Sequence, residues 1–171
     1  MKATVKDIAV CAFLAAILFV VQVMLGFLPN IELVSLLVIL YTLEFRKKTL
    51  WVIYVFAVLE GLVYGFGVWW WMYLYVWTIL YSIAGLFRKN TSTLLWALIS
   101  GIYGLCFGFL CSFPYLIMGG PGAMLSFFIS GIPFDLLHGA GNFVVMLVFY
   151  KPVRQILSRI AGYCERGGQA P

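Results

Sequence analysis

"TLWVIYVFAVLEGLVYGFGVWWWMYLYVWTILYSIAGLF", residues 49–87, contains a single charged side chain, Glu60. As one helix this stretch would be roughly 58 Å long at about 1.5 Å per residue, nearly twice the ~30 Å hydrocarbon core of a membrane. It must therefore turn. The segment "YGFGVWWW" (64–71) supplies two glycines, followed by aromatic residues typical of a membrane interface. The stretch predicts two apolar helices joined by a short turn.

The rest of the chain has the same character. It has 171 residues, of which 64% are hydrophobic and only 10% are charged, whereas a soluble domain carries about 25% charged residues. Breaks such as "LPN" (28–30) and "GGPGA" (119–123) separate the apolar runs, which are 8–28, 31–45, 50–66, 72–87, 94–117 and 125–150. We therefore predict one all-α domain over residues 1–171. It would be an integral bundle of six transmembrane helices with a cytoplasmic tail, 151–171.

The basic residues predict the orientation of this bundle. All 11 of them precede the first run or follow the second, fourth or sixth: Lys2, Lys6, Arg46, Lys47, Lys48, Arg88, Lys89, Lys151, Arg154, Arg159 and Arg166. Because basic loops stay inside, we expect a multi-pass protein of the bilayer with both termini in the cytoplasm. The net charge of +5 is a topology signal of this kind, and we expect no nucleic-acid partner.

Polar residues inside the apolar runs are the main functional signal. Ionisable groups there are costly and usually face a partner or a cavity. Asp135, His138 and Asn142 are three and four positions apart, so on a helix they share one face. These residues could simply hold the helices together. We expect instead that they line a ligand cavity open to the outside, because Glu60 places a second acid on another span.

The aromatic segment "VWWWMYLYVW" (68–77) has two interpretations. Tryptophan and tyrosine gather at membrane interfaces as anchors. Three adjacent tryptophans, Trp69 to Trp71, exceed what an anchor needs, and their faces could stack on a flat heteroaromatic ring.

Several classes of protein do not fit the chain. It has one histidine, no GxSx, HExxH or Walker motif, no Cys/His cluster and no internal repeat. We therefore expect neither enzymatic activity nor a metal site nor a cofactor. A ligand-binding membrane subunit and a membrane scaffold remain.

Two segments resemble a known family. The "AFLAA" segment has Ala12 and Ala16 four positions apart, and the last run reads "PFDLLHGAGNFVVMLVFYKPV" (133–153). Together with six short spans, these segments look like the substrate-binding S components of energy-coupling factor (ECF) vitamin transporters. The resemblance implies a bacterial cell membrane and capture of a vitamin from outside. It also implies a transmembrane coupling subunit (T component), which Ala12 and Ala16 would contact, and two cytoplasmic ATPases.

The resemblance also places the substrate pocket at the outer loops and the outer ends of the later helices. On this chain that region contains Asn30, Glu32, Glu60, Tyr64, Trp69, Trp70, Trp71, Tyr73, Trp77, Asp135, His138 and Asn142. The similarity is greatest to members assigned to hydroxymethylpyrimidine or pyridoxine-type compounds. An acidic vitamin would favour Lys or Arg in the outer half, which has none. Cobalamin, with His138 as a cobalt ligand, is the main alternative within the family.

Overall fold

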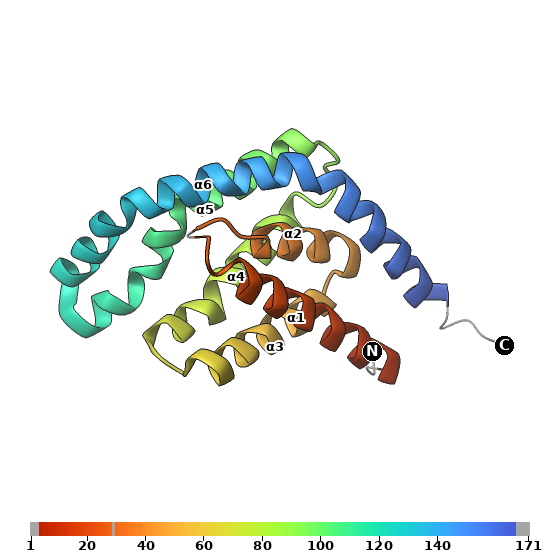
Figure 1. Ribbon diagram of the computed structural model, residues 1–171, viewed down its shortest axis with the longest axis horizontal. Helices are drawn as coiled ribbons and strands as arrows, with labels where there is room; N and C mark the ends of the chain where they lie inside the picture. Colours follow the sequence, from red (N-terminus) through yellow and green to blue (C-terminus); the bar gives the residue numbers. More distant parts are fainter. Residues whose placement is uncertain (1–3, 29, 167–171) are drawn as a thin grey trace.

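The computed structural model describes residues 4–28 and 30–166, and these residues form six helices without any strand (Figure 1). The helices are α1 Val5–Leu25, α2 Val34–Phe45, α3 Lys48–Tyr64, α4 Val68–Leu86, α5 Thr93–Cys111 and α6 Phe113–Arg166. The predicted all-α class and the number of helices are confirmed. The turn predicted within 49–87 lies at Gly65, whose φ of 85° is accessible to glycine at little cost.

The long apolar helices indicate a membrane protein. Within the described part of the chain, three helices are long and apolar enough to cross a bilayer: α1, α5 and α6. The other three are shorter or carry more polar and aromatic residues. The second, α2, has only 12 residues, or roughly 18 Å.

The short helix α2 lies at the centre of the molecule. All its residues from Val34 to Thr42 are buried, and it contacts α1, α3, α4 and α6. In Figure 1 it lies beneath α6, with α1 and α3 on its other side. A helix that is apolar all round is typical of a buried core element. At its C-terminal end, Arg154 of α6 donates to Glu44 over 3.0 Å and to the Tyr150 hydroxyl over 2.6 Å.

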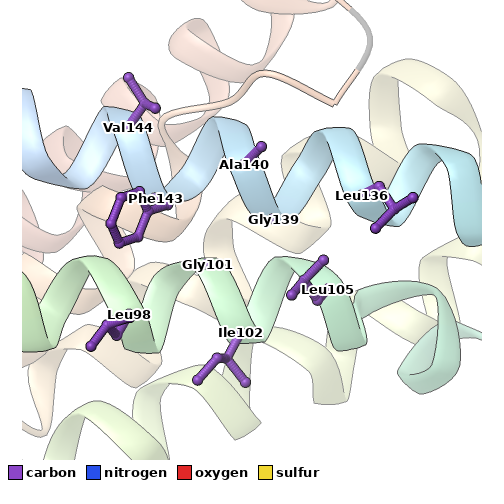
Figure 2. Close-up of a pocket in the computed structure, with 9 residues that line it drawn as sticks. All are labelled: Leu98, Gly101, Ile102, Leu105, Leu136, Gly139, Ala140, Phe143 and Val144. Carbon is purple, nitrogen blue, oxygen red and sulfur yellow. The ribbon is translucent and has the colours of Figure 1, made fainter.

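The helices α5 and α6 pack side by side through glycines. A Cβ atom at Gly104 would lie 2.9 Å from backbone atoms of Gly139 and His138, so only glycine permits this approach. Gly139 belongs to the same contact, since a Cβ there would lie 2.5 Å from the Leu105 side chain, whereas a Cβ at Gly131 would meet nothing within 4 Å among the described atoms. Beside this crossing lies an apolar groove of about 390 Å³, lined by side chains such as Leu105 and Phe143 (Figure 2).

The boundary between α5 and α6 differs from the prediction. The apolar run 94–117 is not one helix, because α5 ends at Cys111 and α6 begins at Phe113. Pro114 lacks the N–H that would continue α5, but at the start of α6 no N–H is needed. The Ser112 hydroxyl between them donates to the Phe109 carbonyl over 2.7 Å.

The last helix is longer than predicted. The expected turn at "GGPGA" is a single non-helical residue, Gly120 with φ 74°, and the chain is helical again from Pro121. Residues 121–166 span roughly 70 Å, more than twice the hydrocarbon thickness, so the helix continues through the predicted tail. Pro29, Lys2 and the last residues of that tail, 167–171, lie outside the described part.

Candidate functional site

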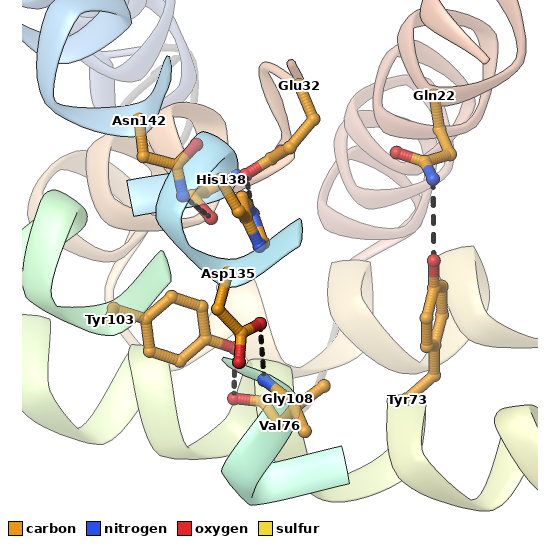
Figure 3. Close-up of polar contacts among 10 residues, drawn as sticks. Gln22, Glu32, Tyr73, Val76, Tyr103, Gly108, Asp135, His138 and Asn142 are labelled. Carbon is orange, nitrogen blue, oxygen red and sulfur yellow. Dashed lines mark hydrogen bonds and ion pairs between the residues drawn. The ribbon is translucent and has the colours of Figure 1, made fainter. Parts of the chain in front are cut away.

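The polar stripe on α6 is bonded to two other segments of the chain (Figure 3). Asp135 Oδ1 accepts a hydrogen bond from the Gly108 N–H of α5 over 2.9 Å. His138 Nε2 lies 3.3 Å from Glu32 Oε1, in the loop before α2. Asn142 Nδ2 donates to the Ser35 hydroxyl over 3.2 Å. We call Glu32, Ser35, Asp135, His138 and Asn142 the polar cluster.

Glu32 is the electrostatic centre of this cluster. Its second oxygen, Oε2, accepts the Ser35 N–H over 2.8 Å at the start of α2. Burial raises the pKa of the Glu32 carboxyl, but the hydrogen bonds from His138 and Ser35 have the larger combined effect, and the net pKa is lowered. The Glu32 carboxyl group thus bonds the loop before α2 to α6 and to the start of α2.

The polar cluster is not fully satisfied by its own bonds. Asp135 Oδ2 and Asn142 Oδ1 are buried and have no hydrogen-bond partner among the described residues. The same holds for the Trp77 Nε1 donor on α4. Buried polar groups usually have partners, so each of these atoms requires an explanation.

A row of aromatic rings leads from the cluster toward α3. The Phe107 ring lies 4.9 Å from the His138 ring and 5.7 Å from the Trp77 ring, between centroids. Tyr73 continues the row 5.6 Å from Trp77, and Trp69 follows 5.3 Å from Tyr73. We call Trp69, Tyr73, Trp77 and Phe107 the aromatic row. Most of these pairs meet edge to face or tilted, the arrangements that aromatic quadrupoles favour.

The far end of the aromatic row opens into a cavity. This α3–α4 cavity, of about 320 Å³, is lined by Glu60, Tyr64, Trp69 and Tyr73. Glu60 is only 3% exposed, and its carboxyl oxygens form no hydrogen bond or ion pair with any described residue. The Tyr73 hydroxyl accepts a hydrogen bond from Gln22 of α1 over 3.4 Å (Figure 3). The cavity therefore combines a buried acid with aromatic walls.

The predicted site residues thus fall into two groups. Glu32, Asp135, His138 and Asn142 lie in the polar cluster. Glu60, Tyr64, Trp69 and Tyr73 line the α3–α4 cavity, and Trp77 lies between the two groups.

Three predicted site residues lie outside both groups. Trp70 donates its Nε1–H to the Ala57 carbonyl over 2.8 Å, and Trp71 is 62% exposed. Asn30 has a left-handed φ of 59°, and its backbone carbonyl lies beside Gly141 of α6. This packing gives Asn30 a backbone role, which its side-chain type did not indicate.

Several residues of the site were missed. Phe107 and Gly108 belong to an apolar run in which no residue type draws attention. The spacing of Gly101, Gly104 and Gly108, three and four positions apart, was a usable signal for one close-packed helix face. Gln22 and Ser35 have no comparable signal in the sequence.

The predicted partner face is a separate feature. Ala12 and Ala16 are exposed on α1, while Leu14, Ala15 and Leu18 on its other face are buried. The small side chains thus lie on the surface of α1 and are open to another helix.

Comparison of the chain with models of protein families, with curated proteins and with solved structures found no match. Within residues 4–28 and 30–166, no three His, Cys, Asp or Glu side chains are grouped so that they could hold a metal ion.

Proposed function

We propose that the chain is the membrane-embedded substrate-binding subunit of an ECF-type importer, and that it binds a small water-soluble vitamin or vitamin precursor. The observation that carries this proposal is the α3–α4 cavity, in which a buried and unpartnered Glu60 faces the rings of Trp69 and Tyr73. Ligand sites of this kind combine aromatic walls with a few polar groups that fix orientation. A bundle held together only by packing has no need of an unpaired acid.

The proposal includes six crossings with both termini in the cytoplasm. The basic residues support it, since they cluster at the start of α1, between α2 and α3, between α4 and α5, and along the end of α6. The 12 residues of α2 are few for a crossing. Because other helices surround α2, its length need not match the hydrocarbon thickness.

The open cavity of about 320 Å³ can hold a one-ring compound such as hydroxymethylpyrimidine or a pyridoxine-like compound. The cavity lining also favours a ligand with hydrogen-bond donors, since Glu60 accepts hydrogen bonds.

The direct test is mass spectrometry of the protein purified from membranes under conditions that keep ligands bound. A bound small molecule that a panel of vitamins displaces would support the proposal. Protein without any ligand, and without affinity for the panel, would contradict it. That result would favour a membrane scaffold, a second candidate supported by the bonds that tie the polar cluster together.

The proposed partners are a transmembrane coupling subunit and two cytoplasmic ATPases, with Ala12 and Ala16 at the contact. Replacing both alanines by leucine should leave ligand binding intact and weaken assembly, because bulk on that face holds helices apart. Co-purification with the coupling subunit measures the effect. The control is Ile8→Leu, a change that adds no bulk at an exposed position of the same helix. Unchanged assembly in the double variant would remove these residues from the interface.

A further inference from the structure

We propose that the α3–α4 cavity selects a ligand with a positive charge on a flat ring, with Glu60 as its counter-ion and Trp69 and Tyr73 as its aromatic walls. This inference rests on the proposed function and names the class of substrate.

The state of Glu60 is the first reason. A buried carboxyl group stays charged only when it is paired or bonded to donors, and otherwise it takes up a proton. The other two buried or half-buried acids near the site have such donors, from Gly108 for Asp135 and from His138 and Ser35 for Glu32. Glu60 has neither a donor nor a cation among the described residues. A neutral ligand would supply hydrogen bonds alone, whereas a cation would also supply the counter-charge.

The positions of the basic side chains are the second reason. The nearest lysine on the same helix is Lys48, about 18 Å away along the axis. Its ammonium group lies 2.6 Å from Asp7, so it is already paired. Arg154 is likewise paired with Glu44. The residues that line the cavity include no lysine or arginine, so the counter-charge for Glu60 would come from the ligand.

The walls of the cavity are the third reason. Aromatic faces attract cations that lie within about 6 Å of the ring centroid. Trp69 and Tyr73 line the same cavity as Glu60, and their rings meet edge to face with centroids 5.3 Å apart. The Phe56 ring stacks on the Tyr73 ring, with centroids 6.0 Å apart, and supports its position. A flat cation can therefore contact the carboxylate and an aromatic face at once.

The test uses three probes of nearly equal size in protein reconstituted in lipid nanodiscs. The cation is 1-methylnicotinamide, the neutral probe is nicotinamide, and the anion is nicotinate. Equilibrium dialysis should show that the cation binds at least about ten-fold more tightly than the neutral probe and that the anion binds least. This series needs no variant, so it stands even if a substitution disturbs folding.

Substitution then assigns the preference to one residue. Glu60→Gln keeps the shape of the side chain and should reduce the cation's advantage over nicotinamide to about two-fold or less. Glu44→Gln removes a carboxylate at the far end of α2 and should retain the full preference. Equal binding of cation and neutral probe, or a preference that survives Glu60→Gln, would overturn the inference. A different outcome would contradict the proposed function itself: purified protein that neither carries nor binds any small molecule.

Discussion

Among the described residues, two acids are buried, Asp135 and Glu60, and they differ in what surrounds them. Asp135 on α6 is 7% exposed and accepts the Gly108 N–H, and the polar cluster around it joins α5, α6 and the loop before α2. Glu60 on α3 is 3% exposed and has no such partner, but it lines a cavity. Burial alone therefore does not identify a ligand site. The partners of the carboxylate separate a structural acid from one that is available to a ligand.

This difference predicts which property each region controls. Changes in the polar cluster should lower the free energy of unfolding, because its bonds tie together segments far apart in the chain. Changes around the α3–α4 cavity should lower the affinity for the ligand and have less effect on stability. The cavity is lined by two consecutive helices, which the turn at Gly65 already holds together.

The largest effect should come from His138→Leu. It removes the hydrogen-bond partner of Glu32 Oε1, and leaving a largely buried carboxyl oxygen unsatisfied costs about 1–3 kcal/mol, or more when the group is charged. Thermal or denaturant unfolding in detergent measures the loss. Ligand affinity of the protein that remains folded should change little. A variant that is as stable as the wild type but has lost ligand binding would show that His138 belongs to the ligand site and has no structural role.

A smaller loss of stability should follow Gly104→Ala. The new methyl group would meet the backbone of Gly139 and His138, which cannot move aside without separating α5 from α6, so we expect a loss of about 1–3 kcal/mol. The matched control is Gly85→Ala on α4, where a Cβ meets nothing within 4 Å of described atoms. There the same change should stabilise the helix by up to about 1 kcal/mol. Equal melting temperatures for the two variants would contradict the close crossing.

The cavity side is tested by two tryptophans. Trp69→Leu removes an aromatic wall and should reduce ligand affinity by about 1 kcal/mol, or roughly five-fold, with little change in stability. Trp71→Leu alters a side chain that is 62% exposed, and its affinity should equal that of the wild type. Calorimetry on both variants measures the difference. Equal affinity in both variants would return the tryptophans to membrane anchoring alone.

The smallest effect is a dependence of stability on pH. The folded-state pKa of Glu32 lies below its ordinary value of 4.5, so its contribution to stability is present above about pH 4.5. That contribution is lost as the pH falls through the lowered pKa. The difference in melting temperature between the wild type and Glu32→Gln should therefore be full at neutral pH and shrink below pH 4.5. A difference that does not vary with pH would show that Glu32 acts only through its shape.

Much of the fold could be predicted from hydropathy and glycine placement. The stretch 49–87 is too long and too apolar for one helix, and its turn lies where the glycines are. The end of α5 was missed because Ser112 and Pro114 interrupt a run that stays apolar on both sides. The length of α6 was missed because Gly120 breaks the helix at one residue only, and because a basic segment after an apolar span reads as a tail rather than as helix.

The site was predictable only where local spacing determines it. Asp135, His138 and Asn142 share a face by helical periodicity, and that face lies inside. Their partners could not be predicted, because Glu32 and Ser35 are more than 100 positions away in the chain. Glu60 and Asp135 were expected to line one ligand cavity. In the structure Glu60 lines the α3–α4 cavity, whereas Asp135 lies in the polar cluster, and the rings of Tyr73, Trp77 and Phe107 connect the two regions.

The contacts of α2 with α6 have a mechanical consequence. Ser35 near one end of α2 is hydrogen-bonded to Asn142 of α6, and Glu44 near the other end is bonded to Arg154 of α6. The two helices are therefore joined near both ends of α2. They should therefore move as one rigid body, which makes the pair a fixed frame. A displacement that admits a solute to the interior should then involve a helix outside this frame, and we expect it in the α3–α4 hairpin, which lines the cavity. Distances between spectroscopic labels should accordingly stay constant within the frame and change only from the frame to the hairpin.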